Sequence, residues 1–228
     1  MLKGSRATDV LASMLEAIAH RGPDARDTWS QDDVWLGHNR LSIIDLTADG
    51  TQPMHGFGSV IVFNGEVYNY VELRHELQQL GFSFSTATDT EVVLAAYRHY
   101  GVDCVKKFVG MWAFALWDLT AKRLFCSRDR FGIKPFHYIE KNGAFHFASE
   151  YKALRCSPHF SAALNVNQAL RGVQMGWNAY HDETYYTVVR TLPAASNLVW
   201  ENGKSRISRY WEIDTSNLSH EDEGNLTA

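Results

Sequence analysis

The order of the expected helices and strands predicts an α+β protein whose antiparallel sheets are covered by helices. Apolar residues recur at helical spacing over 9–19, with Thr8 as an expected N-cap, and Gly22-Pro23 ends the pattern. Two more helices are expected over 70–80 and 89–100, each followed by a glycine. A run of strands follows, expected at 111–117, 123–127, 136–139 and 144–148. Helices followed by a run of strands are typical of the α+β class, whereas a parallel doubly wound sheet alternates strand and helix.

The remaining segments carry weaker patterns. Short strands are expected at 34–38 and 59–63, before the second helix. From about Leu164 the pattern fades, and a late hairpin over 198–211 is the next expectation. Residues 212–228 are polar and acidic, which predicts a tail or the start of a linker after one domain over 1–211.

Composition excludes several classes of function. The chain has 228 residues, is 45% hydrophobic and carries a formal net charge of −4, so no overall basic field would attract nucleic acid. Its apolar runs are too short to span a membrane, and the N-terminus lacks the apolar segment of a secretory signal. Cys104, Cys126 and Cys156 are scattered, which favours a reducing compartment and predicts a cytoplasmic location. Neither a metal site nor a cofactor is expected.

Three polar loops could converge on one small ligand. They are residues 37–45 (GHNRLSIID), Asn64-Gly65-Glu66, and residues 88–91 (TDTE), which open a helix. Arg40 would pair with an α-carboxylate, and Asp89 or Glu66 would hold an α-ammonium group. The Asn64 amide and the Gly65 N–H would both donate to one oxygen, as in an oxyanion hole. This set indicates an amino-acid ligand.

Each of these residues also has a structural interpretation. Asn64-Gly65 is a frequent hairpin turn, and Asp89 could cap the helix that it opens. The aliphatic part of Arg40 could cover the core, and Glu66 could lie on the surface. Asp129, between two arginines, is expected to fix its loop through local ion pairs. No serine-nucleophile elbow or phosphate-binding glycine loop is present, so these residues alone assign no nucleophile.

Eight stretches taken together resemble the glutaminase domain of asparagine synthetase, a class II glutamine amidotransferase and N-terminal-nucleophile hydrolase. They are RGPD (21–24), GHNRLSIID (37–45), QPM (52–54), FNGEVYNY (63–70), TDTE (88–91), MWAFALWD (111–118), RDRFGIKP (128–135) and FASEYKAL (147–154). The resemblance implies a four-layer αββα sandwich of two antiparallel sheets between helices. It also implies glutamine as the ligand and a synthetase domain or subunit as a partner.

The same resemblance implies roles for individual residues. Asn64 and Gly65 would form the oxyanion hole, and Asp89 would bind the α-ammonium group of glutamine. The other implied substrate-binding residues are Arg40, Leu41, Ser42, Ile43, Ile44 and Glu66.

The sequence departs from this family at the nucleophile. In the family an N-terminal cysteine attacks the amide, and its own α-amino group, with a pKa of about 7.7–8.0, is the base. Here position 2 is Leu2, and the family's Cys-Gly-Ile opening strand is absent from the printed sequence. Losing an inner strand would leave its neighbours' backbone groups unpaired, unless something replaces it. The family's Ser-Gly-Gly-Leu-Asp-Ser-Ser loop for ATP pyrophosphate is also absent.

These departures leave alternatives open. The main expectation is a glutaminase-like domain that binds glutamine for ammonia supply and amide transfer, and that is hydrolytically inactive as printed. Its true start could lie upstream of Met1. The alternative is a non-catalytic glutamine-binding or structural domain that acts through a synthetase-like partner. A truncated fragment with no role is the third interpretation.

Overall fold

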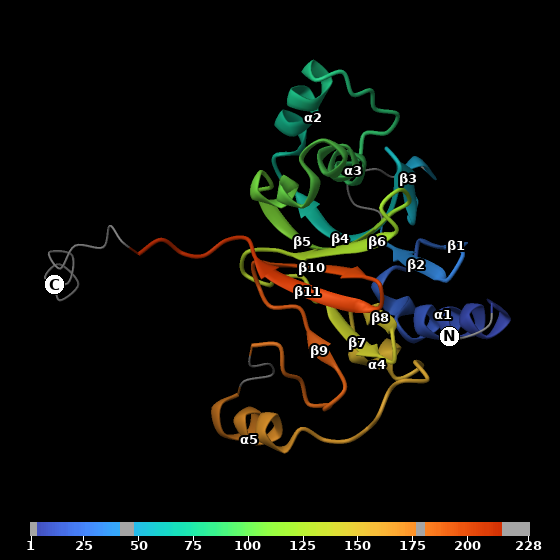
Figure 1. Ribbon diagram of the computed structural model, residues 1–228, viewed down its shortest axis with the longest axis vertical. Coiled ribbons are helices and arrows are strands. Elements are labelled where there is room, and N and C mark those ends of the chain that lie inside the picture. The colour runs from blue at the N-terminus through green and yellow to red at the C-terminus, as the bar shows by residue number, and fades with distance from the viewer. Residues whose placement is uncertain (1–3, 42–47, 177–180, 216–228) are drawn as a thin grey trace, which may run out of the picture.

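Four layers of secondary structure stack in the computed structural model, which describes residues 4–41, 48–176 and 181–215 (Figure 1). Helices α2 (Tyr70–Gln79) and α3 (Asp89–Tyr100) form one outer layer. A six-stranded sheet follows, then a layer of two smaller sheets, and then α1 (Gly4–Ala17) with the short α4 (Tyr151–Leu154). Helix α5 (Val166–Met175) lies apart at the lower edge in Figure 1.

The six-stranded sheet is antiparallel, with the order β11-β10-β6-β5-β4-β3. Its strands are β3 (Met54–Gly56), β4 (Ser59–Val67), β5 (Gly110–Asp118), β6 (Arg123–Arg128), β10 (Ser196–Glu201) and β11 (Lys204–Arg209). The central pair places Asn64 opposite Ala113 and Gly65 opposite Trp112.

The neighbouring layer consists of two separate antiparallel sheets. Strands β1 (Ala25–Gln31) and β2 (Val34–Arg40) form a two-stranded sheet. Strands β7 (His137–Lys141), β8 (Ala144–Ala148) and β9 (Arg190–Thr191) form a three-stranded sheet in the order β8-β7-β9. Three 3₁₀ helices complete the regular structure of the described residues: Ala19–Arg21, Ala48–Gly50 and Gly101–Lys106.

Three apolar cores separate the four layers. The first lies between α2, α3 and one face of the six-stranded sheet, and contains Phe63, Leu94 and Trp112. The second lies between the sheets, where Val62 and Ala115 meet Leu36 and Tyr138. The third joins Ile139 of β7 to α1 and α4 through Met14 and Leu154. Alternate residues of β4, β5 and β7 therefore face opposite cores, as expected for strands buried on both faces. The predicted αββα sandwich is confirmed.

The structure corrects several expected boundaries. Helix α1 begins at Gly4, so Thr8 is an interior residue and not the N-cap. Strand β4 continues to Val67 instead of ending at Phe63. Strand β1 and helix α5 were not expected. Strand β1 exposes most of its residues and lacks an apolar alternation, whereas α5 does carry signals, because Asn165 caps its start and Gly176 ends it at φ 69°.

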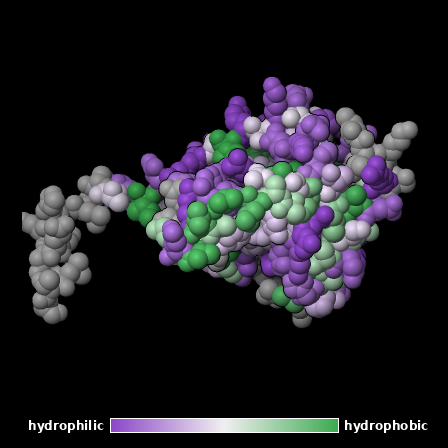
Figure 2. Space-filling model, turned by 90° about the horizontal axis from the view of Figure 1, so that it is seen from below, coloured by the Kyte–Doolittle hydropathy of each residue, from purple (hydrophilic) through white to green (hydrophobic). Residues whose placement is uncertain are grey.

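The surface of the described residues carries both polar and apolar areas. Seen from below in Figure 2, hydrophilic side chains surround apolar patches. Helix α5 exposes four large apolar side chains: Val166, Leu170, Val173 and Met175. Among the described helices, none is both long and apolar enough to cross a membrane.

Candidate functional site

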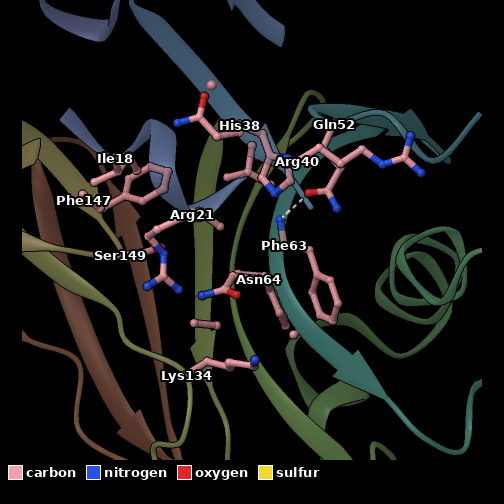
Figure 3. A pocket seen from close by; sticks show the side chains of 18 of the residues that line it. Ile18, Arg21, His38, Arg40, Gln52, Phe63, Asn64, Lys134, Phe147 and Ser149 are labelled. Carbon is pink, nitrogen blue, oxygen red and sulfur yellow. Dashed lines mark hydrogen bonds between the residues drawn. The ribbon is translucent and has the colours of Figure 1, made fainter. Parts of the chain in front are cut away.

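A cavity of about 330 Å³ lies between the two sheet layers and reaches α1 (Figure 3). Parts of all three predicted polar loops line it: Arg40, Leu41, Asn64, Gly65 and Asp89. Glu66 is half-buried and is not among the lining residues. Ser42, Ile43 and Ile44 lie outside the described residues, so their predicted role stays a prediction. The structure therefore brings Arg40, Asn64 and Asp89, which the sequence placed on three separate loops, to one cavity.

Asn64 and Gly65 lie inside strand β4 and not in a hairpin turn, so the turn interpretation is wrong. Gly65 adopts φ 151°, and a Cβ at this position would collide with the carbonyl oxygen of Met111 on β5. The Asn64 Nδ2 group is buried and has no hydrogen-bond partner among the described residues. Figure 3 shows the amide directed into the cavity. An unpaired buried donor is costly, so it suits an acceptor supplied by a ligand.

Gln52 holds the backbone just before Asn64. Its Oε1 accepts a hydrogen bond from the Phe63 N–H at 2.6 Å (Figure 3). Its Nε2 donates to the Thr90 hydroxyl at 3.4 Å. Strand β4 is thereby tied to the first turn of α3. Sequence reasoning assigned Gln52 no role, although it belongs to the QPM stretch that carries the resemblance.

Asp89 makes a second connection between α3 and β4. Its Oδ2 accepts a hydrogen bond from the Val67 N–H at 2.9 Å, and the residue is 4% exposed. Thr88 is the N-cap, since its hydroxyl accepts from the Glu91 N–H, so the capping interpretation of Asp89 is wrong. Burial raises the pKa of Asp89, although hydrogen bonds to Val67 and Thr90 oppose the rise. A cationic group in the cavity would favour the charged form.

Arg40 is nearly buried, at 9% exposed, and supplies a cation to the cavity. Its guanidinium packs against Gly50, where a Cβ would collide with Nη2. The neighbouring His38 stays neutral because burial lowers its pKa to about 4, and the charge of Arg40 adds to this effect. The positive charge on this wall therefore belongs to Arg40.

Two further cations and a hydroxyl line the cavity without having been predicted: Arg21, Lys134 and Ser149. All three lie in the stretches that carry the family resemblance. Arg21 donates a hydrogen bond to Glu150 at 3.1 Å, which places its guanidinium at the β8 side of the cavity.

Asp129 positions the loop that carries Lys134. Its carboxylate accepts hydrogen bonds from the N–H groups of Phe131 at 3.1 Å, Ile133 at 3.0 Å and Lys134 at 3.0 Å. A fourth, from Trp112 on β5, is 3.3 Å long. The predicted structural role is therefore correct, but backbone donors and not ion pairs perform it.

All three cysteines belong to the described residues, and none lines the cavity. Cys104 and Cys126 are fully buried, and burial raises the pKa of both thiols. Cys156 packs at the edge of the core between α1 and α4. Cys104 and Cys126 are therefore packing residues.

Comparison with known proteins decides the family. The model of a glutamine amidotransferase domain matches residues 1–211. The chain belongs to this family. The amidotransferase chain is 35% identical to putative asparagine synthetase (glutamine-hydrolyzing) 2 of Methanocaldococcus jannaschii, over 88% of its own length and 43% of that protein. It is 34% identical to asparagine synthetase (glutamine-hydrolyzing) 3 of Bacillus subtilis, over 89% of its length and 33% of that protein.

Solved structures of low identity share the fold of this amidotransferase domain. Glutamine phosphoribosylpyrophosphate amidotransferase from B. subtilis superposes with a TM-score of 0.66 at 16% identity, covering 90% of this chain and 47% of that one. The chain spans less than half the length of the curated relatives named above. The resemblance found from the eight stretches is confirmed.

Proposed function

We propose that this amidotransferase domain binds glutamine in the cavity between its two sheet layers. The α-carboxylate pairs with Arg40, the α-ammonium with Asp89, and the side-chain amide oxygen accepts from Asn64 Nδ2 and the Gly65 N–H. The observation that carries the proposal is the buried, unpaired Asn64 donor in a cavity that also presents a buried cation and a buried carboxylate.

The proposed biological role is nitrogen supply for amide transfer, in asparagine biosynthesis. The names of the relatives support it, and the nitrogen acceptor would be bound by a synthetase domain or subunit. We further propose a cytoplasmic location, which three free cysteines support.

We infer that the chain as printed does not hydrolyse glutamine by itself. Family chemistry requires a thiolate with a nearby base, and the three cysteines lie in or against apolar cores, away from the cavity. The same observation favours the second candidate function, a glutamine-binding domain that acts through a partner.

Two measurements on the purified chain test these proposals. Calorimetry with glutamine should give saturable heat, whereas asparagine, one methylene shorter, should bind at least about tenfold more weakly. No heat at millimolar glutamine would reject the binding proposal. Glutamate release should stay at background, and release that Asn64→Ala abolishes would reject the inferred inactivity.

A further inference from the structure

The edge of β4 that faces away from β5 loses its strand partner part-way along. Among the described strands, β3 pairs with residues 59–61 of β4 only, whereas β4 continues to Val67 and pairs with β5 throughout. Pro53, the next residue in the β3 register, has no N–H to donate, so the ladder ends there. The backbone groups of β4 beyond residue 61 that face this edge therefore need other partners.

Two side chains hold this edge on either side of Gly65. Gln52 Oε1 accepts a hydrogen bond from the Phe63 N–H at 2.6 Å. Asp89 Oδ2 accepts from the Val67 N–H at 2.9 Å. Continuing the β3 register places Gln52 opposite Phe63, so its side chain replaces the backbone partner that β3 no longer supplies.

The Gly65 N–H points to the same edge. Hydrogen-bonded and non-hydrogen-bonded pairs alternate along an antiparallel ladder, and Phe63 belongs to a non-hydrogen-bonded pair because its N–H goes to Gln52. Gly65, two residues later and opposite Trp112, belongs to the next such pair. Trp112 agrees with this assignment, since its own N–H and C=O groups both bond to Asp129. The donor assigned to the oxyanion hole therefore lies between the two held positions and faces away from β5.

The carbonyl group of Phe63 is held as well. Burial lowers the pKa of His38, and a hydrogen bond to the Phe63 backbone opposes this effect, so the imidazole donates and the carbonyl accepts. This carbonyl belongs to the peptide group that joins Phe63 to Asn64. Side chains therefore fix both backbone groups of the residue that precedes Asn64.

We propose that Gln52 is a positioning residue for recognition of the ligand's side-chain amide. By holding the Phe63 N–H, it keeps Asn64 Nδ2 and the Gly65 N–H in the geometry that one ligand oxygen requires. A neighbouring strand would pair with the Gly65 N–H too, whereas a side chain holds Phe63 and leaves the Gly65 donor available. The inference rests on the proposed function, because that function assigns both donors to an amide oxygen.

Hydrogen exchange on the full chain tests whether Gln52 holds the edge. Gln52→Leu removes the acceptor at similar volume and should speed exchange of the Phe63 amide at least about tenfold. Asn69→Leu is the matched control, because Asn69 likewise accepts from a backbone N–H, that of Val109 at 2.9 Å, outside the cavity. It should speed exchange at Val109 and leave Phe63 unchanged. Parent-like exchange of the Phe63 amide in Gln52→Leu would overturn the proposal.

Ligand selectivity separates positioning from a general loosening of the cavity. L-Homoleucine matches glutamine in shape but carries an isopropyl group in place of the side-chain amide. In calorimetry, Gln52→Leu should weaken glutamine binding at least about tenfold and change homoleucine binding by less than about twofold. Asn69→Leu should change neither affinity. An equal loss for both ligands in Gln52→Leu would show a structural role alone and overturn the proposal.

Thr90→Val tests the same residue through its other contact if Gln52→Leu does not fold. It removes the hydroxyl that accepts from Gln52 Nε2 at 3.4 Å and leaves the bond to Phe63 in place. Glutamine binding should weaken about threefold, with homoleucine binding unchanged. Parent-like glutamine affinity in either folded variant would reject the role of Gln52 alone. No heat with glutamine from the parent chain would instead reject the proposed function, and exchange at Phe63 would still decide whether Gln52 holds the edge.

Discussion

The Asp89 carboxylate accepts a hydrogen bond from the Val67 N–H at 2.9 Å, which joins the first turn of α3 to the last residue of β4. Gln52 makes a second connection between the same elements, from Phe63 to Thr90. Asn64 and Gly65 lie on β4 between these two connections. The strand segment that carries the proposed oxyanion hole is therefore fixed to the helix that carries the proposed ammonium ligand.

Asp89→Asn should weaken glutamine binding by roughly ten- to a hundredfold, because a charge-assisted pair with the ammonium group is lost. The amide oxygen can still accept from the Val67 N–H, so the fold should persist. Calorimetry with glutamine and a urea unfolding curve check both points. Unchanged affinity in a folded variant would remove Asp89 from the binding site.

The pH dependence of binding follows from the raised pKa of Asp89. Because its folded-state pKa lies above its unfolded value, the group's stability contribution is present below the unfolded pKa and is lost as pH rises through the folded pKa. The ammonium group of glutamine favours the charged carboxylate, so glutamine affinity should fall as the pH is lowered. The fall should begin at a higher pH than it would for a carboxyl group of ordinary pKa near 3.9. Calorimetry from pH 7 to pH 4.5 measures this fall. Asp89→Asn should flatten it.

Asn64→Ala should separate binding from stability. It removes an unpaired buried donor, so the free energy of unfolding should stay the same or rise by up to about 1 kcal/mol, whereas glutamine affinity should fall about tenfold. Asn69→Ala is the opposite control. Its side chain donates to the Lys107 carbonyl at 3.0 Å and accepts from the Val109 N–H at 2.9 Å, outside the cavity. That change should cost about 1–3 kcal/mol of stability and leave glutamine binding intact.

Local signals predicted the helices that end at a glycine. Gly81 and Gly101 follow α2 and α3 closely, and both helices agree with expectation within one residue. The proposed roles of Asn64, Gly65 and Asp89 came from residue chemistry and from the order of the motifs, and not from periodicity. Gln52 was missed because its partners lie 11 and 38 residues away along the chain, and no local pattern records such contacts. The interpretation of Asp89 as a cap failed because the hydroxyl of Thr88 occupies that position.

Gly65→Ala should destabilise the fold by roughly 3–5 kcal/mol, because its Cβ would meet the Met111 carbonyl and its φ is 151°. Gly58→Ala is the matched control, since φ there is also positive, at 81°, but apart from its chain neighbours no heavy atom of the described residues lies within 4 Å of the added carbon. The free energy of unfolding should fall only by the cost of holding an alanine at positive φ, roughly 1–2 kcal/mol. Urea unfolding of both variants measures the difference. Equal losses would show that the close approach of β4 and β5 is not required.

Asp129→Asn should destabilise the chain by about 2–4 kcal/mol, although it changes one atom. The carboxylate accepts from four backbone N–H groups, and an amide NH₂ in place of one oxygen would face donors with another donor. The loop that positions Lys134 would loosen, so glutamine affinity should fall as well. Asp32→Asn, which removes an exposed ion pair with Lys122, should change stability by less than about 0.5 kcal/mol. If Asp129→Asn unfolds at the same urea concentration as the parent chain, the loop is held by contacts other than these hydrogen bonds.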